Sequence, residues 1–148
     1  MKFNCSEDQD YFRTLLCEDD EDFDRYESLF DVGREPKVKR DEFNRIRGRI
    51  LNQLKEQYGL TCQLGYADIC DINSGVEVDH IIPLSSNKLN KELRNLPPLE
   101  KGKKVPSQSL GSNHLNNLAI ACKKCNAHKK HRLLSKSEIK RILATKGV

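Results

Sequence analysis

The sequence predicts an α+β fold, in which a few helices surround two short strands. Three observations favour this class. Residues 41–58 carry an apolar stripe at helical spacing, whereas 77–82 and 118–121 are short apolar runs that are typical of strands. The second run leads directly into a stretch that reads as a helix, 123–134. A strand, a long connection, a strand and a helix are therefore expected at the centre, and 148 residues fit one domain.

An acidic N-terminal arm, residues 1–36, precedes a basic body, residues 37–148. The arm holds 12 acidic and 4 basic side chains, a net charge of −8, and the body holds 22 basic and 10 acidic ones, a net charge of +12. A basic body is typical of polyanion binders, although ordinary surface lysines give the same count. Apolar residues on both sides of an acidic turn at 18–24 predict two short helices in the arm. The arm is either a solvated helical cap or a segment that contacts the body or a protein partner.

The helix predicted over 41–58 follows Gly33 and Pro36 and ends at Gly59. Its apolar stripe is expected to pack on the body and consists of Phe43, Ile46, Ile50, Leu51 and Leu54. Its arginines point elsewhere, and they either meet phosphate or form a solvated face. After this helix, 62–75 is expected to be a loop, and Gly75 and Pro83 bound the strand at 77–82.

A long connection, 84–116, is irregular apart from a short helix within 88–96. Connections of this length are usually functional or disordered, so its lysines form either an added nucleic-acid contact or part of a plain linker. Beyond the helix at 123–134, Ser135 and Glu138 have the spacing of a capping box. The last helix therefore begins there, and its buried side is Ile139, Ile142 and Leu143.

The sequence also bounds the compartment. No apolar run reaches the roughly 18 residues that a membrane span needs, and the first residues lack the apolar core of a signal peptide. We therefore expect a cytoplasmic protein that has no membrane partner. In that compartment, the six cysteines are better explained as thiols or metal ligands than as disulfides.

An acid and a histidine, Asp79 and His80, stand side by side near the end of the first strand. Hydrolysis of a phosphodiester bond needs an activated water, charge relief on the phosphate and help for the leaving oxygen. A histidine of near-neutral pKa suits the first task. Mg²⁺ or Mn²⁺ held by oxygen ligands suits the other two. Asp79 and the side-chain oxygen of Asn126, in the helix after the second strand, are suitable ligands.

Two cysteines, Cys122 and Cys125, have the C-x2-C spacing of a zinc site. Structural zinc sites take four ligands, and Cys62 and Cys70 are the candidate partners. Seven residues separate that second pair, which departs from the usual two. The alternative to a Zn²⁺ site is a group of four buried thiols.

Together, these motifs resemble the HNH endonuclease family over residues 77–131, a little over a third of the chain. The pattern of that family is Asp-His-Ile-x-Pro, then Asn-Leu, then Cys-x-x-Cys-Asn-x-x-Lys. This chain has Asp-His-Ile-Ile-Pro at 79–83, Asn-Leu at 117–118 and Cys-Lys-Lys-Cys-Asn-Ala-His-Lys at 122–129. The resemblance implies a ββα-metal core with a structural zinc site, flanked by N-terminal helices and a C-terminal helix.

The resemblance also assigns roles. It makes His80 the general base, and it makes Asp79 and Asn126 the ligands of Mg²⁺ or Mn²⁺. Asn117 has a structural role in the catalytic site, where it hydrogen-bonds the loop that aims His80. The implied activity is metal-dependent hydrolysis of DNA by a restriction or phage-type nuclease, leaving 5′-phosphate and 3′-hydroxyl ends. The basic residues expected to hold the DNA are Lys129, Lys130, Arg132, Arg45 and Arg49.

Two other classes stay open. One is a non-catalytic zinc module that binds DNA or a protein, and the other is a toxin nuclease whose cognate partner masks the basic face. The four residues Asp79, His80, Asn117 and Asn126 argue against the binding module, because binding alone needs none of them. One catalytic site cuts one strand, so double-strand cutting needs a homodimer or two successive nicks.

Overall fold

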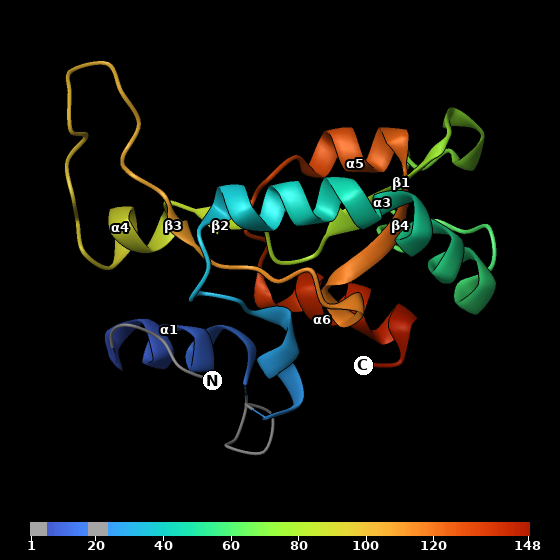
Figure 1. Ribbon diagram of the computed structural model, residues 1–148, viewed down its shortest axis with the longest axis horizontal. Helices are drawn as coiled ribbons and strands as arrows, with labels where there is room; N and C mark the ends of the chain where they lie inside the picture. Colours follow the sequence, from blue (N-terminus) through green and yellow to red (C-terminus); the bar gives the residue numbers. More distant parts are fainter. Residues whose placement is uncertain (1–5, 18–23) are drawn as a thin grey trace.

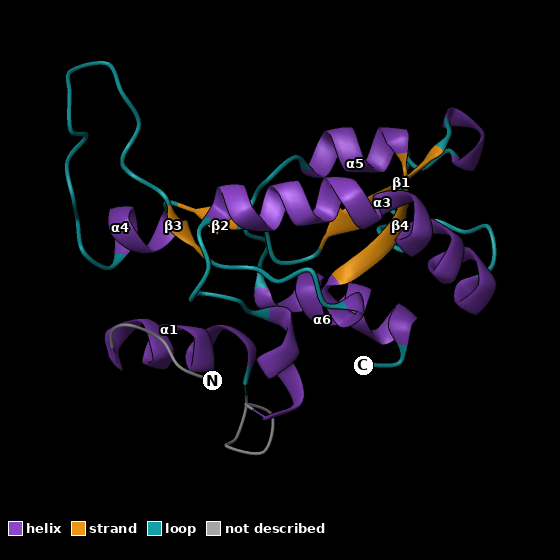
Figure 2. Cartoon of the chain, in the orientation of Figure 1, coloured by secondary structure: helices purple, strands orange, loops and turns teal. Residues whose placement is uncertain are grey.

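The computed structural model describes residues 6–17 and 24–148. Helices and small antiparallel sheets are mixed in it, so the predicted α+β class is confirmed (Figure 2). The helices are α1 (Ser6–Leu16), α3 (Pro36–Tyr58), α4 (Lys88–Glu92), α5 (Lys123–Lys129) and α6 (Lys136–Lys146). The strands are β1 (Val76–His80), β2 (Ser85–Ser86), β3 (Gln108–Ser109) and β4 (Leu118–Cys122). No described helix is long and apolar enough to cross a membrane.

The central sheet pairs β1 with β4 in antiparallel register, with Asp79 opposite Ala119 and His80 opposite Leu118. Every residue of β4 is buried. Ala119 and Ala121 belong to the main core, whereas Leu118 and Ile120 belong to a smaller cluster beneath α3. Alternate residues of a strand point to opposite faces, so β4 supplies both cores. The helices α3, α5 and α6 surround this sheet (Figure 1): α3 packs over the smaller cluster, whereas residues of α5 and α6, such as Cys125 and Ile139, belong to the main core.

The long helix α3 begins five residues before the predicted start, with Pro36 in its first turn. Proline suits that position because its fixed φ is helical and its missing N–H has no intrahelical partner there. The predicted stop is confirmed, since Gly59 has φ 78° and its N–H donates to the Lys55 carbonyl. The stripe of α3 packs on β1 and β4 through Phe43 and other apolar residues.

The bounds of the two C-terminal helices were predicted with different accuracy. Helix α5 ends at Lys129, five residues before the predicted end, because Lys130 turns to φ 57°. Arg132 then donates to the carbonyls of His128 and Lys129, which would otherwise lack partners. The predicted start of α6 is confirmed: the Ser135 hydroxyl caps it by accepting from the Glu138 N–H, and α6 buries the three predicted residues.

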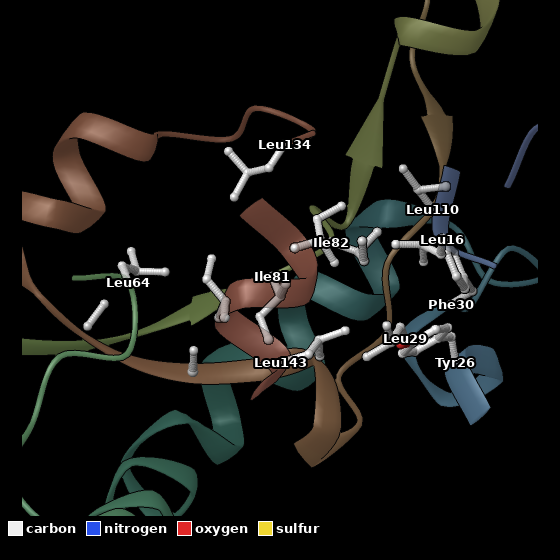
Figure 3. Close-up of a cluster of buried hydrophobic side chains, with 14 of the residues drawn as sticks. Leu16, Tyr26, Leu29, Phe30, Leu64, Ile81, Ile82, Leu110, Leu134 and Leu143 are labelled. Atoms are coloured by element: carbon white, nitrogen blue, oxygen red, sulfur yellow. The ribbon is translucent and has the colours of Figure 1, made fainter. Parts of the chain in front are cut away.

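The N-terminal arm contributes to the main core, shown in Figure 3. Its buried side chains are Phe12, Leu16, Tyr26, Leu29 and Phe30. They pack with Ile81 and Ile82, which follow β1 and lie outside the strand that was predicted to contain them. Most of the acidic turn at 18–24 lies outside the described residues. The arm and the body therefore share one core.

The long connection between β1 and β4 contains more regular structure than its composition predicts. Strands β2 and β3 pair at its base, and α4 lies between them in sequence. Gly111 is required there, because a Cβ at this position would lie 2.1 Å from the Ile82 carbonyl oxygen. This close approach places the segment that leads into β4 beside the segment that leaves β1.

Candidate active site and cysteine cluster

A cleft of about 400 Å³ opens beside β1. Asp79 and His80 from β1 line it together with Asn126 from α5. One face of α3 forms a further wall. The exposed basic residues on the cleft are Arg40, Arg47, Lys123, Lys130 and His131. The fold thus gathers an acid, an imidazole and an amide beside a strongly basic rim.

His80 is a neutral imidazole at ordinary pH. Its ring is 9% exposed, and its edge packs against the Phe43 ring with 4.5 Å between the centroids. Burial lowers the pKa of His80 to about 4, against the opposing effect of its hydrogen bond to Asn113 and with a contribution from the charge of Arg40. The imidazole is therefore unprotonated near neutral pH, but the lowered pKa also makes it a weaker base than the histidine of near-neutral pKa that the sequence predicted.

The Asp79 carboxylate forms a buried ion pair with Lys129. The Lys129 Nζ lies 3.3 Å from Asp79 Oδ1 and 3.2 Å from Oδ2, and it donates to the His80 carbonyl over 2.9 Å. Burial raises the pKa of Asp79 to about 6, and the ammonium opposes this shift. Among the described residues, Oδ2 receives no hydrogen bond. Lys129, expected on a DNA-contacting face beside Lys130, lines the cleft but is only 1% exposed, and its ammonium is held by Asp79 and the His80 carbonyl.

Asn117 is fully buried and links the two segments that flank the central sheet. Its Oδ1 accepts from the Ile82 N–H over 2.8 Å. Its Nδ2 donates to the Ile82 carbonyl over 3.0 Å and to the Ser112 carbonyl over 2.8 Å. The side chain therefore holds the backbone that follows His80 by two hydrogen bonds and ties it to the Ser112 segment by a third.

The basic residues expected to contact DNA are only partly gathered on the cleft. Lys130 lines it, whereas Arg45 and Arg49 are exposed on α3 outside its lining, and Arg132 closes the end of α5. Arg40 and Arg47 of α3 line the cleft in their place. Residues 40, 43, 47 and 51 share one helix face because they are three or four positions apart. A predicted helix that began before residue 40 would have placed Arg40 on this face.

Four cysteines come together beside the central sheet. The sulfurs of Cys62, Cys70, Cys122 and Cys125 all lie within 4.8 Å of one another. A tetrahedral zinc with Zn–S bonds of about 2.3 Å holds its sulfurs about 3.8 Å apart, so a small inward movement suffices. This cluster could hold a structural metal such as zinc.

Backbone N–H groups point at the sulfurs of this cluster. Cys122 Sγ accepts from the N–H of Asp71 over 3.4 Å and of Cys125 over 3.3 Å, and Cys62 Sγ accepts from the Cys122 N–H over 3.3 Å. Burial opposes ionisation of Cys122, but these donors and the neighbouring thiols lower its pKa to about 6. Burial and the adjacent thiols raise the pKa of Cys125. One thiolate thus sits in a nest of N–H donors, a favourable start for a metal site.

Comparisons with models of known families, with curated proteins and with solved structures found no match to this chain. The functional interpretation therefore rests on the residues of the chain itself.

Proposed function

We propose that this protein is a metal-dependent endonuclease of the HNH type that hydrolyses DNA phosphodiester bonds. The observation that carries the proposal is the cleft that Asp79, His80 and Asn126 all line, beside a basic rim. These are the residue types that phosphodiester hydrolysis requires, and binding alone requires none of the three.

His80 acts as the general base. Its pKa of about 4 keeps the ring unprotonated at neutral pH, so it is ready to take a proton from water without first losing one. Its packing against Phe43 and its hydrogen bond to Asn113 restrict the ring to one orientation. A fixed base needs less reorganisation when the water attacks.

Asp79 and Asn126 are the proposed ligands of Mg²⁺ or Mn²⁺. Carboxylate and amide oxygens are the donors that these hard cations favour, and the buried Asp79 Oδ2 lacks a hydrogen bond among the described residues. Bound there, the cation would supply charge relief on the phosphate and on the leaving oxygen. Lys129 keeps the Asp79 carboxylate ionised against the effect of burial.

The rim holds the nucleic acid. Arg40, Arg47, Lys123 and Lys130 surround the cleft, and contacts of this type bind phosphate without reading sequence. The cysteine cluster is assigned to a structural Zn²⁺, held by all four thiols. It joins the segment after α3 to the start of α5, the helix that carries Asn126.

One observation favours a second candidate, a non-catalytic zinc module that binds nucleic acid. The Lys129 ammonium already lies against both carboxylate oxygens of Asp79, so this acid has a cationic partner without any metal. In such a module, the same rim would bind DNA, and added Mg²⁺ or Mn²⁺ would have no chemical effect.

The test is incubation of the protein with supercoiled plasmid and Mg²⁺ or Mn²⁺, with and without EDTA. Wild type is expected to nick or linearise the plasmid only when the cation is free. His80→Ala should lower the rate by about 10²–10⁴-fold, the usual contribution of a general base. His128→Ala is the matched control, because His128 is exposed on α5 and packs on Tyr66 outside the cleft.

The outcomes separate the candidates. Cleavage by wild type and His128→Ala but not by a folded His80→Ala supports the nuclease. A wild type that retards the plasmid in a gel but never cuts it, whichever cation is present, supports the binding module. Parallel reactions with RNA of the same sequence establish which nucleic acid is preferred.

A further inference from the structure

Asn113 is the hydrogen-bond partner of the His80 ring. It lies between β3 and β4, is 9% exposed, and is 33 residues away from His80 in the chain. Its Oδ1 is 2.8 Å from His80 Nε2. On the other side of the amide, Nδ2 is 2.8 Å from the Lys39 carbonyl oxygen and 2.9 Å from Glu42 Oε1.

These partners fix the orientation of the amide. A carbonyl oxygen and a carboxylate only accept hydrogen bonds, so the atom that faces Lys39 and Glu42 must be the NH₂ group. The opposite orientation would place Oδ1 against two oxygens. Oδ1 therefore faces His80, and the ring nitrogen that it contacts must carry the proton. In a neutral ring, this leaves the lone pair on Nδ1.

The acceptors are themselves held in place. The Arg34 guanidinium donates to both Glu42 oxygens, over 2.8 Å and 3.1 Å, and to Asp31 over 2.7 Å. The bonds from Arg34, and then the bond from Asn113, lower the pKa of Glu42 to about 2. Glu42 is therefore an obligate acceptor at neutral pH. A chain of hydrogen bonds runs from the N-terminal arm through α3 to the His80 ring.

We propose that Asn113, anchored by Glu42 and Arg34, is a positioning residue that holds His80 in the Nε2–H tautomer and leaves Nδ1 to take the proton from water. The kinetic part of this proposal rests on the proposed function, in which His80 is the general base. The tautomer itself depends only on the geometry of the free protein.

The first test is spectroscopic and uses the full chain labelled with ¹⁵N-histidine. Long-range ¹H–¹⁵N NMR distinguishes a protonated ring nitrogen from an unprotonated one, and loss of signals in His80→Gln assigns the His80 ring. Wild type should show Nε2 protonated and Nδ1 unprotonated at neutral pH. Asn113→Leu keeps about the same size but removes the acceptor, so it should show a mixture of tautomers.

The matched control is Asn116→Leu, the same exchange three residues along, where the amide contacts Ser28 and not His80. It should keep the wild-type His80 spectrum. A wild-type ring that is a mixture, or that is protonated at Nδ1, would overturn the proposal without any variant. A folded Asn113→Leu that keeps the pure Nε2–H tautomer would overturn it as well.

The second test is kinetic, on the plasmid substrate. Asn113→Leu should lower kcat by about 10–100-fold, the loss typical when the hydrogen-bond partner of a metal-ligating histidine is removed, while KM and the Asn116→Leu rate stay unchanged. An unchanged kcat in Asn113→Leu contradicts the positioning role. If wild type shows the pure tautomer but never cuts nucleic acid, the proposed function fails while the structural assignment stands.

Discussion

At the scale of single residues, the buried pair of Lys129 and Asp79 is the main electrostatic feature of the site. Both side chains are almost fully buried, and each charge compensates the opposite charge of its partner. Breaking such a pair by changing one partner costs about 3–5 kcal/mol, because the remaining charge stays buried alone. The pair therefore constrains how the site tolerates substitution.

The first prediction concerns this pair. Lys129→Met is expected to lower the free energy of unfolding by about 3–5 kcal/mol at pH 8, because the buried Asp79 must then either stay ionised without a partner or take up a proton, and both cost stability. Adding Asp79→Asn should restore most of the loss, since the amide is neutral. Urea denaturation of the two single variants, the double variant and wild type forms the thermodynamic cycle. Losses that simply add in the double variant would show that the two charges are not coupled.

At the scale of elements, the cysteine cluster and the buried Lys146 join parts of the chain that are far apart in sequence. The cysteine cluster joins the segment after α3, the end of β4 and the start of α5. Lys146, in the last turn of α6, donates to the Leu118 carbonyl at the start of β4 over 2.6 Å and lies 4.7 Å from the centre of the Tyr58 ring. The cysteine cluster predicts a bound zinc ion, and Lys146 predicts a pH dependence of stability.

The second prediction concerns the cysteine cluster. Structural zinc contributes about 10–16 kcal/mol in zinc-finger peptides, which is comparable with the total stability of a domain, about 5–15 kcal/mol. Purified protein should contain one zinc per chain by elemental analysis, and Cys125→Ser should lose it together with its native circular dichroism. Cys17→Ser, outside the cluster, should keep both. Wild type that is folded and free of zinc would exclude the structural metal.

The third prediction is a pH dependence that originates at Lys146. Burial lowers the pKa of Lys146 from 10.5 to about 8. Between these values the unfolded state binds more protons than the folded state, so the contribution of this residue to stability rises with pH. Measured by urea denaturation, wild type should gain stability relative to Lys146→Met from pH 7 to pH 9.5. Lys37→Met, at an exposed lysine of α3, should show no such trend. If the difference in free energy of unfolding between wild type and Lys146→Met is the same at every pH, the pKa of Lys146 is not lowered.

At the scale of the whole molecule, the acidic arm and the basic body share one core. The buried arm residues are Phe12, Leu16, Tyr26, Leu29 and Phe30. In addition, Asp8 of α1 is buried and pairs with Arg94 beyond α4. The arm therefore contributes both core packing and negative charge. A test of its charge must leave its core packing intact.

The fourth prediction separates these two roles. Deleting 1–36 should unfold the protein, because each of five buried side chains contributes about 1.5–3 kcal/mol. The exposed acids Glu7 and Asp24 can be neutralised instead. The variant Glu7→Gln/Asp24→Asn should stay folded and bind DNA more tightly, chiefly at low salt, because less negative charge shields the basic face. Filter binding at two salt concentrations measures this, and equal affinities at both would leave the arm with a structural role alone.

The sequence by itself determined the features that depend on neighbouring residues. The short apolar runs of β1 and β4, the stop at Gly59 and the helix start at Ser135 are local features, and each is found where it was predicted, within a few residues. The end of α5 was predicted five residues too late, because no glycine or proline at this point of the sequence indicates the positive φ of Lys130.

Only the tertiary structure decided which polar groups meet. Lys129 was expected on the surface because a helical wheel cannot show that Asp79, 50 residues earlier, draws its ammonium inside. Asn113 was missed because its contact with His80 spans 33 residues and requires α3 to supply its other partners. Such contacts form only when distant segments pack, where burial makes an unpaired polar group costly and so selects its partner. The spacing of residues along the sequence therefore cannot predict these contacts.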